Sequence, residues 1–385
     1  MAHILFKASQ SQPCLPEGPI RSLLHCLTLG ILPVFILGTG LKLRAITDAP
    51  TGPDSADHSA LVEAAAWIQR DSQIDTEYRY VMTCKLRLLF FWVGSEDVGG
   101  GYIRIGKSVA APPQQMIQIL FGSDPAKAPH AINRWGAGTE ILRNSDSGGP
   151  PAGAFFGFMK SSKGQSVSAM QQELSKEKSH GNHLFEGIIS RVDGNRALST
   201  TVPYASSQDF DLHHYAEAEK ATLQQLGSSG DRKVRRLEGA REMQCPRVGG
   251  FLSTMLQLVD DAVAGRPVPA SLCYVYNARH YTATLLGVQP VPQRAVHVVL
   301  RGEASLNPTY RKLQEAHFEV VGKESESKSS FDILIGTEGK LRGAPVQITY
   351  QPNWWFQIIL NLLPDSSPSD DRKASSPRPS PGGGL

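Results

Sequence analysis

Alternation of apolar and polar residues over strand-length segments constrains the fold of this chain more than any other feature. In YRYVMTCKLRLLFFWVG (Tyr78–Gly94), every second residue from Tyr80 to Trp92 is apolar or aromatic, and Lys85 and Arg87 fall between them. Successive side chains of a strand point to opposite faces, so this period predicts one long strand with an apolar face. Short connections between further segments of this kind predict neighbouring strands that pair antiparallel.

The other segments predict shorter strands and three helices. Apolar residues recur at helical spacing in Ser59–Arg70 and Phe251–Ala264, and a third helix is expected over Asp211–Leu226. We expect a turn at Gly94–Gly101 and a hairpin over His183–Ala205, built around an Asp-Gly dipeptide. The remaining expected strands cover residues 102–109, 115–122, 154–162, 271–277, 280–288, 295–303, 317–321, 331–335, 345–351 and 353–363.

These elements predict a β-rich α+β fold with two antiparallel meander sheets. Each sheet is accompanied by one or two helices and can curve into a half-barrel. The expected divisions are an export signal or membrane anchor with its leader (1–46), a linker (47–58), an N-terminal helix-and-sheet domain (59–226), a basic connector (227–249), a C-terminal helix with a seven-strand meander (250–363) and a disordered tail (364–385).

The N-terminus contains an apolar run, Leu23–Leu41, without Lys, Arg, Asp or Glu. Basic residues flank it on both sides, which is typical of a segment that partitions into a bilayer. We favour an export signal cleaved near residues 40–45 over an uncleaved anchor, because Pro33 and several glycines weaken a rigid span. A buried core helix is a third alternative.

Cysteine usage leaves the redox state open. Five cysteines are present, and removal of the leader would leave Cys84, Cys245 and Cys273. An odd number cannot pair completely within one chain. If export permits a disulfide, Cys245 with Cys273 is the preferred pair, and buried free thiols are the more favoured alternative.

The string GYIRIGKS (Gly101–Ser108) satisfies the phosphate-loop pattern G-x-x-x-x-G-K-[ST]. A phosphate loop needs a helix that begins at the Lys-Ser pair, whose N-terminal N–H groups bind the phosphates. Here the middle residues alternate like a strand, and Pro112 and Pro113 would break the required helix. We therefore expect a strand, and no nucleotide as cofactor or partner.

Two weaker patterns involve polar side chains. His213 and Glu217 share a helix face at spacing four, which suits two metal ligands, but no third ligand is placed beside them. Ser175 and Lys178 stand at S-x-x-K spacing in a hydrophilic run. We interpret both patterns as exposed surface, and expect neither a metal nor a cofactor.

Adjacent tryptophans in the last expected strand give the one candidate ligand or partner platform. Trp354 and Trp355 would point to opposite faces, with Trp354 on a wholly apolar face. One ring then belongs to the core, and the other packs on a neighbouring element or offers an aromatic surface to a sugar, a lipid or a protein.

The closing segment GTEGKLRGAPVQITYQPNWWFQIILNLL (Gly336–Leu363) is similar, in its turn-strand-turn-strand pattern, to the end of LolA-like lipoprotein-carrier half-barrels. The likeness covers residues 336–363 alone and carries over no functional residue. It implies a curved sheet whose apolar concave face holds a lipid-like group.

The favoured function is therefore a non-catalytic binding or structural protein of the cell envelope or periplasm, delivered or anchored by the N-terminal run. Its partners would be the membrane and a hydrophobic ligand or envelope protein. A net charge of +3 does not suggest a nucleic-acid binder. The alternative is an exported hydrolase whose catalytic residues are dispersed in the sequence.

Overall fold

The computed structural model describes residues 55–88, 91–109, 114–143, 152–160, 183–228, 234–238, 245–292, 312–323 and 328–363. The apolar N-terminal run, the Ser175–Lys178 pattern, the expected strand at 295–303 and the expected tail all lie outside these residues. Within the described part of the chain, no helix combines the length and the apolar character that crossing a membrane requires.

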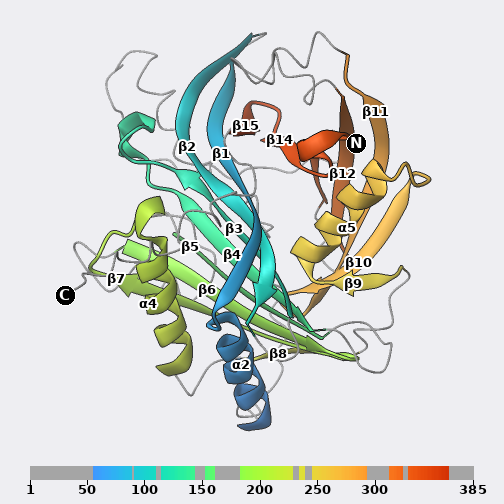
Figure 1. Cartoon of the computed structure of the whole chain (residues 1–385). Coiled ribbons are helices and arrows are strands. Elements are labelled where there is room, and N and C mark those ends of the chain that lie inside the picture. Colours follow the sequence, from blue (N-terminus) through green and yellow to red (C-terminus); the bar gives the residue numbers. More distant parts are fainter. Residues whose placement is uncertain are drawn as a thin grey trace, which may run out of the picture.

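Strands make up most of the described structure (Figure 1). The helices are α2 (Ser55–Ile68), α4 (Tyr215–Ser228) and α5 (Phe251–Val263), and the 3-10 helices are η1 (Pro129–Ala131), η2 (Leu212–His214) and η5 (Gly339–Leu341). The strands are β1 (Ser72–Leu88), β2 (Phe91–Ser108), β3 (Gln114–Ser123), β4 (Trp135–Arg143), β5 (Ala152–Lys160), β6 (His183–Asp193), β7 (Arg196–Ser206), β8 (Arg235–Leu237), β9 (Arg247–Gly249), β10 (Ala270–Tyr276), β11 (Arg279–Pro290), β12 (Leu313–Gly322), β13 (Lys328–Gly336), β14 (Pro345–Asn353) and β15 (Phe356–Leu362).

All fifteen described strands form one sheet, in the order β8-β7-β6-β5-β4-β3-β2-β1-β15-β14-β13-β12-β11-β10-β9. Neighbours pair antiparallel except β9 and β10, which are parallel. The β-rich α+β class with antiparallel meanders is thus confirmed. The two expected meanders are joined because β1 pairs with β15, with Tyr80 opposite Leu362 and Leu86 opposite Phe356.

The joined sheet carries a core on each face. On the inner face, defined here as the face that contacts α5, buried residues from both halves form one cluster that includes Tyr80, Ile117, Leu258 and Phe318. On the outer face, α2 and α4 cover the N-terminal strands around the fully buried Trp135. Figure 1 shows α5 between the N-terminal strands and β10–β12, so this helix lies inside the curved sheet.

Curvature also brings the distant strands β5–β7 against the end of β10. The rings of Phe155 and Tyr276 lie with centroids 5.3 Å apart, and the Ser199 hydroxyl donates a 3.0 Å hydrogen bond to the Asn277 side-chain oxygen. These contacts are between side chains and not between backbone groups of paired strands. The strand order therefore still ends at β8 on one side and at β9 on the other. The inner core is therefore enclosed from several sides.

The structure corrects the expected long strand at Tyr78–Gly94 and the turn at Gly94–Gly101. β1 ends at Leu88, and β2 already begins at Phe91 and runs through the three glycines Gly99–Gly101. A Cβ on Gly99 would lie 2.1 Å from the Gly122 carbonyl oxygen, and one on Gly101 would lie 1.7 Å from that of Leu120. These glycines therefore permit close approach of β2 to β3 rather than a reversal.

A second correction concerns the expected strand at 353–363. The chain turns at Trp354 and Trp355, so that Asn353 pairs with Phe356 and β15 begins only after the two tryptophans. Trp354 is exposed instead of buried on the apolar face, and Trp355 is half-buried against the inner core. The alternation of apolar residues continues through this turn, so it predicts an unbroken strand over residues 353–363.

The expected helices at Phe251–Ala264 and Asp211–Leu226 are present as α5 and as η2 with α4. α2 begins at Ser55, inside the expected linker, where the Asp57 carboxylate forms ion pairs with Arg196 and Arg236. The expected connector at 227–249 contains β8 and β9, the two short strands at which the sheet ends.

Candidate ligand-binding site

A cavity of about 270 Å³ lies between α5 and the inner face of the sheet. We call it the α5 cavity. Its walls come from both halves of the chain. The N-terminal strands contribute Tyr78 of β1, Ile103 and Ile105 of β2, and Ile117 and Ile119 of β3. The C-terminal half contributes Phe251, Leu252, Met255, Leu256, Val259 and Asp260 of α5, Phe331 and Ile333 of β13, Arg342 and Gly343 after η5, and Pro345, Ile348 and Tyr350 of β14.

Strand register explains the isoleucine wall. Ile103 pairs with Ile119 and Ile105 pairs with Ile117 across β2 and β3, so all four side chains lie on one face. Directly opposed β-branched residues pack well on a pleated surface. The intervening Arg104 points to the other face, where its guanidinium lies 3.9 Å from the ring centroid of Tyr102. Alternation in the sequence thus produces a continuous apolar wall.

A buried carboxylate of β4 holds the first turn of α5. Glu140 accepts hydrogen bonds from the N–H groups of Gly250 (2.9 Å) and Leu252 (2.8 Å), and from the Ser253 hydroxyl (2.5 Å). The first N–H groups of a helix lack partners within the helix, so an acceptor here fixes the position of α5. Burial raises the pKa of the Glu140 carboxyl, and the bonds from Ser253, Leu252 and Gly250 oppose that shift.

Polar groups gather at one part of the cavity wall. Asp260 and Arg342 are exposed and Tyr78 is half-buried, so this part of the wall faces solvent, while the half-buried Tyr350 lies farther along β14, opposite Phe331. A Cβ placed on Gly343 would lie 3.9 Å from Oδ1 of Asp260, which puts that carboxylate beside the loop after η5. Gly343 has φ of +77°, a conformation that favours glycine. We call Asp260, Arg342 and Tyr78 the polar rim.

Electrostatics at the polar rim favour neutral forms of its acids. Burial raises the pKa of Asp260, and the neighbouring Asp261 carboxylate raises it further, while Arg266 opposes the shift. Burial, and then the Asp260 charge, raise the pKa of the Tyr78 hydroxyl. At neutral pH the Tyr78 hydroxyl is therefore a hydrogen-bonding group, and the Arg342 guanidinium is a permanent cation.

The described lining residues contain no Ser, Thr, Cys or His. Their groups that can give up or take a proton are the Asp260 carboxyl and the hydroxyls of Tyr78 and Tyr350. What the arrangement can do is take up an apolar group and contact one polar end at the rim.

A smaller cavity, of about 170 Å³, lies where β1 and β2 approach their connection. Its lining is mostly apolar and includes Leu86, Val93, Val98 and Cys84. Burial raises the pKa of the Cys84 thiol to about 12. A thiol with so high a pKa is a weak nucleophile at neutral pH, so we treat Cys84 as a packing residue.

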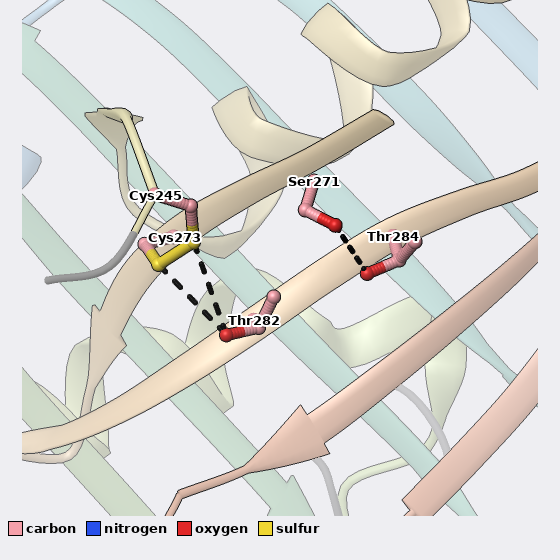
Figure 2. The surroundings of a disulfide bond; sticks show 5 residues. All are labelled: Cys245, Ser271, Cys273, Thr282 and Thr284. Atoms are coloured by element: carbon pink, nitrogen blue, oxygen red, sulfur yellow. Dashed lines mark hydrogen bonds between the residues drawn. A yellow bond between two sulfur atoms is a disulfide. The ribbon is translucent and has the colours of Figure 1, made fainter. Parts of the chain in front are cut away.

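The structure joins Cys245 and Cys273 in a disulfide with a Cα–Cα distance of 5.5 Å (Figure 2). It ties the segment before β9 to β10, the last two strands of the sheet order. Thr282 of β11 lies beside both sulfur atoms, and Ser271 and Thr284 form a further cross-strand contact at 2.9 Å. The bond fixes this edge of the sheet, which also carries α5.

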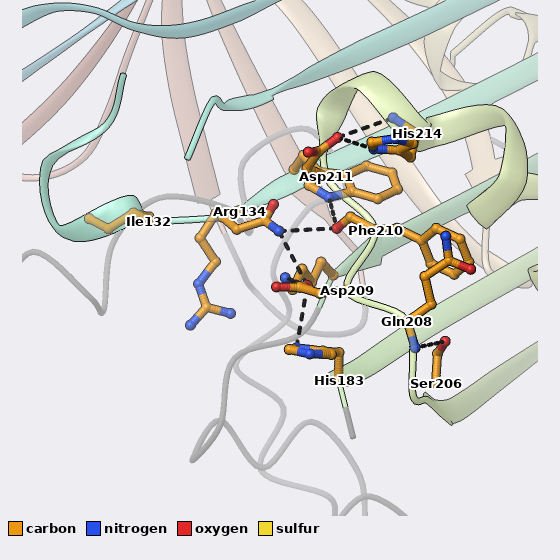
Figure 3. Close-up of polar contacts among 12 residues, drawn as sticks. Ile132, Arg134, His183, Ser206, Gln208, Asp209, Phe210, Asp211 and His214 are labelled. Carbon is orange, nitrogen blue, oxygen red and sulfur yellow. Dashed lines mark hydrogen bonds and ion pairs between the residues drawn. The ribbon is translucent and has the colours of Figure 1, made fainter. Parts of the chain in front are cut away.

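The candidate metal residues lie in adjacent elements: His213 in η2, with its Nε2 3.3 Å from Asp124 Oδ2, and Glu217 in the first turn of α4. Among the described residues, no group of three or more His, Cys, Asp or Glu side chains could hold a metal ion. Figure 3 shows His214 facing Asp211 and His183 facing Asp209, and these two pairs hold the segment before α4 in place.

The structure also describes the phosphate-loop string and the two adjacent tryptophans. Gly101–Ser108 lies within β2 as an extended strand, with Lys107 paired to Gln73 and Gln115. Trp354 and Trp355 form the β14–β15 turn, away from the lining of the α5 cavity. The cavity residues themselves were not singled out from the sequence. Their only signals were the alternation in β2 and β3 and the helical period of α5.

No protein-family model matches the sequence, and no curated protein sequence matches it. Among solved structures, the chain is similar to a beta-barrel-like protein of a domain of unknown function, DUF1849, from Brucella abortus. The TM-score is 0.36 and the sequence identity 11%, over 75% of this chain and 96% of that chain.

Proposed function

We propose that this chain is a non-catalytic binding protein that holds the apolar chain of a single-chain amphiphile, such as a fatty acid, in the α5 cavity. The observation that carries the proposal is the continuous apolar wall of α5, β2, β3, β13 and β14, which ends at one polar rim. A pocket lined by apolar side chains, with a few polar groups at one place, is the general form of a small-molecule site.

Cavity size supports one chain rather than a lipid with several chains. The volume of about 270 Å³ lies just below the usual range of small-molecule pockets, which starts at roughly 300 Å³. Each methylene group transferred from water into such a site contributes about 0.8 kcal/mol. A chain of several methylenes therefore gains enough to bind without any specific polar contact.

The polar rim supports an anionic or hydrogen-bonding head group. Arg342 offers a planar set of donors that fits a carboxylate, and Tyr78 can hydrogen-bond the same group. Asp260 opposes an anion when it is ionised, but its raised pKa reduces this opposition as the pH falls. A fatty acid carboxylate at Arg342, with its tail along the isoleucine wall, satisfies both parts of the cavity.

The described lining offers no serine, threonine or cysteine nucleophile, which supports binding over hydrolysis through one of these side chains. The apolar run Leu23–Leu41 supports delivery of the protein to the cell envelope, where single-chain amphiphiles are released from membranes. Both points remain part of the proposal.

Titration with a fluorescent fatty acid, such as cis-parinaric acid, tests the site. Leu256 lines the cavity and Leu286 lies exposed on β11, so the same substitution can be made at both positions. We expect Leu256→Trp to displace at least two methylenes of the ligand and to weaken binding by at least tenfold. Leu286→Trp should bind as the unsubstituted protein does.

Equal binding by all three proteins, or an equal loss in both variants, would refute the proposed site. Circular dichroism and thermal melting check that Leu256→Trp folds. If it does not, Met255→Phe makes a smaller change to the same wall and repeats the comparison.

A second measurement tests the head group. Arg342→Ala should weaken a fatty acid about two- to fivefold, the value of an exposed charge pair. It should leave the affinity for the alkanol of the same length unchanged, because the alkanol carries no charge. A loss that is equal for acid and alcohol would place the carboxylate elsewhere.

A further inference from the structure

Exposed aromatic side chains gather at one end of the molecule, apart from the α5 cavity. Phe91 is 65% exposed, Trp92 38%, Val93 53% and Trp354 65%. We call these four residues the aromatic tip. They account for almost half of the exposed large apolar residues in the described part of the chain, although they come from two short segments. Isolated exposed apolar residues are common, but a cluster of large ones marks an interaction site.

Strand pairing fixes the two segments side by side. Phe91 opens β2 next to the β1–β2 connection, and Trp354 lies in the β14–β15 turn. The Arg87 N–H of β1 donates a 2.8 Å hydrogen bond to the Trp355 carbonyl oxygen, which binds the turn to the hairpin. Trp355 itself packs against the inner core, with its ring centroid 5.9 Å from that of Phe356. The aromatic tip is therefore held on rigid strands rather than on a free loop.

Cationic side chains accompany the aromatic tip, and acidic ones do not. Lys85 and Arg87 lie on β1, with Arg87 opposite Trp92 and Lys85 opposite Gly94 in the β1–β2 register. The sequence contains no Asp or Glu between Cys84 and Ser95, nor between residues 351 and 361. Farther along β2 come the exposed Glu96 and Asp97, and Asp97 forms a 3.2 Å ion pair with Lys127. The end of the hairpin is therefore both apolar and positively charged.

This combination fits a lipid bilayer with anionic head groups. Tryptophan rings favour the membrane–water interface, where one side of the ring meets acyl chains and the indole N–H meets water. Lysine and arginine beside them gain from the negative surface potential of anionic lipids. A protruding hairpin end can enter a fluid surface that adapts to it, whereas a protein partner would need a matching hollow.

The apolar surface continues behind the aromatic tip. Val93 is exposed at the tip and also lines the smaller cavity of about 170 Å³, together with Leu86 and Cys84. An acyl chain that contacts Val93 from the bilayer side thus meets further apolar surface rather than polar backbone. This continuity favours lipid over a water-soluble occupant.

We propose that the aromatic tip, with Lys85 and Arg87, is a membrane-docking surface that inserts into the interface of bilayers containing anionic lipid. The surface is distinct from the α5 cavity and does not depend on the function proposed for it. It orients the protein with the β1–β2 and β14–β15 hairpins towards the bilayer.

The test uses the full chain with vesicles of phosphatidylcholine, with or without phosphatidylglycerol. Because the chain also carries the apolar run Leu23–Leu41, the readout must be local. Amide hydrogen exchange gives it: peptides covering residues 85–95 and 351–357 should gain protection when anionic vesicles are added. The exposed β6–β7 turn, at residues 193–196, should gain none.

Paired variants identify the side chains responsible. Trp92→Ser with Trp354→Ser should abolish the protection of the tip peptides, whereas Val268→Ser with Leu286→Ser removes comparably exposed apolar groups elsewhere and should not. Lys85→Gln with Arg87→Gln should weaken partitioning to anionic vesicles about fivefold for each cation removed, and should leave neutral vesicles unaffected.

Vesicle-bound protein whose tip peptides stay unprotected would overturn the proposal. So would protection of those peptides that rises with protein concentration in the absence of vesicles, because the occupant would then be a second copy of the chain.

Discussion

Removal of the Glu140 side chain tests how the α5 cavity is built. The carboxylate is 1% exposed and is the acceptor for the N–H groups of Gly250 and Leu252 at the start of α5. The Ser253 hydroxyl also donates to it, but that group keeps a second acceptor in the Gly250 carbonyl at 3.2 Å. Glu140→Ala therefore removes the acceptor of the two short N–H bonds, from Gly250 and Leu252, and of a longer one of 3.4 Å from the Ser253 N–H.

The magnitude follows from the two short N–H bonds. A buried donor that loses its partner costs about 1–3 kcal/mol, so we expect Glu140→Ala to lower the free energy of unfolding by about 2–6 kcal/mol. Glu140→Gln retains the volume and one acceptor oxygen, so its loss should be smaller. Because α5 forms one wall of the cavity, affinity for a fatty acid should fall together with stability.

Glu186 of β6 provides a matched control. Burial raises the pKa of the Glu186 carboxyl, as it does for Glu140, but Oε2 of Glu186 accepts no hydrogen bond within the described structure. The Arg235 charge offsets part of the burial of Glu186, so Glu186→Gln removes a buried charge and one ion-pair partner together, and stability should stay within about 1 kcal/mol. The two Glu→Gln variants make the same chemical change. They differ in whether the carboxylate accepts hydrogen bonds from the start of a helix.

Urea denaturation followed by far-ultraviolet circular dichroism measures the free energies. Hydrogen exchange of residues 250–256 shows whether the loss is local to the start of α5. The reasoning fails if Glu140→Ala unfolds at the same urea concentration as the unsubstituted protein. It also fails if Glu186→Gln loses as much stability as Glu140→Gln.

Three further predictions follow from the disulfide, the free thiol and the polar rim. Replacing Cys245 and Cys273 with serine opens a loop with a sequence separation of 28 and should lower the free energy of unfolding by roughly 3–4 kcal/mol; an unchanged urea midpoint in non-reducing buffer would contradict this. Cys84, with its pKa of about 12, should react with a thiol reagent at pH 8 only on unfolding, since about one thiol in ten thousand is then ionised; rapid labelling of the native protein would argue against it. The raised pKa of Asp260 means that its stabilising contribution is complete below about pH 4 and is lost as the pH rises through the folded pKa. Asp260→Asn should therefore raise the melting temperature at pH 8 and leave it unchanged at pH 3, and a fall at pH 8 would show that the carboxylate is stabilising.

The elements of this fold can be predicted from the sequence where a local period is strong. The helical spacing of Leu252, Met255 and Val259 predicts α5, and the alternation from Tyr80 to Leu86 predicts the inner face of β1. Local periods identify which residues are buried. They do not say which segment covers them.

The joining of the sheets and the cavity depend on contacts between segments far apart in the sequence. Pairing of β1 with β15 and the bond from Gly250 to Glu140 connect positions that no local pattern relates. The same limit explains the two misplaced turns. Gly99–Gly101 have the composition of a turn but allow close strand approach. Trp354 and Trp355 are not usual turn residues, and the turn residues Pro352 and Asn353 lie just before them.

The central claim is that the α5 cavity holds an apolar chain, and photocrosslinking tests it most directly. A fatty acid with a diazirine in its tail is bound to the full chain and irradiated, and the labelled peptides are identified by mass spectrometry. We predict labels on α5 residues 251–259 and on residues 331–350 of β13 and β14, with loss of both in Leu256→Trp. Labels confined to α2, α4 or the aromatic tip, or labelling unchanged by Leu256→Trp, would contradict the account.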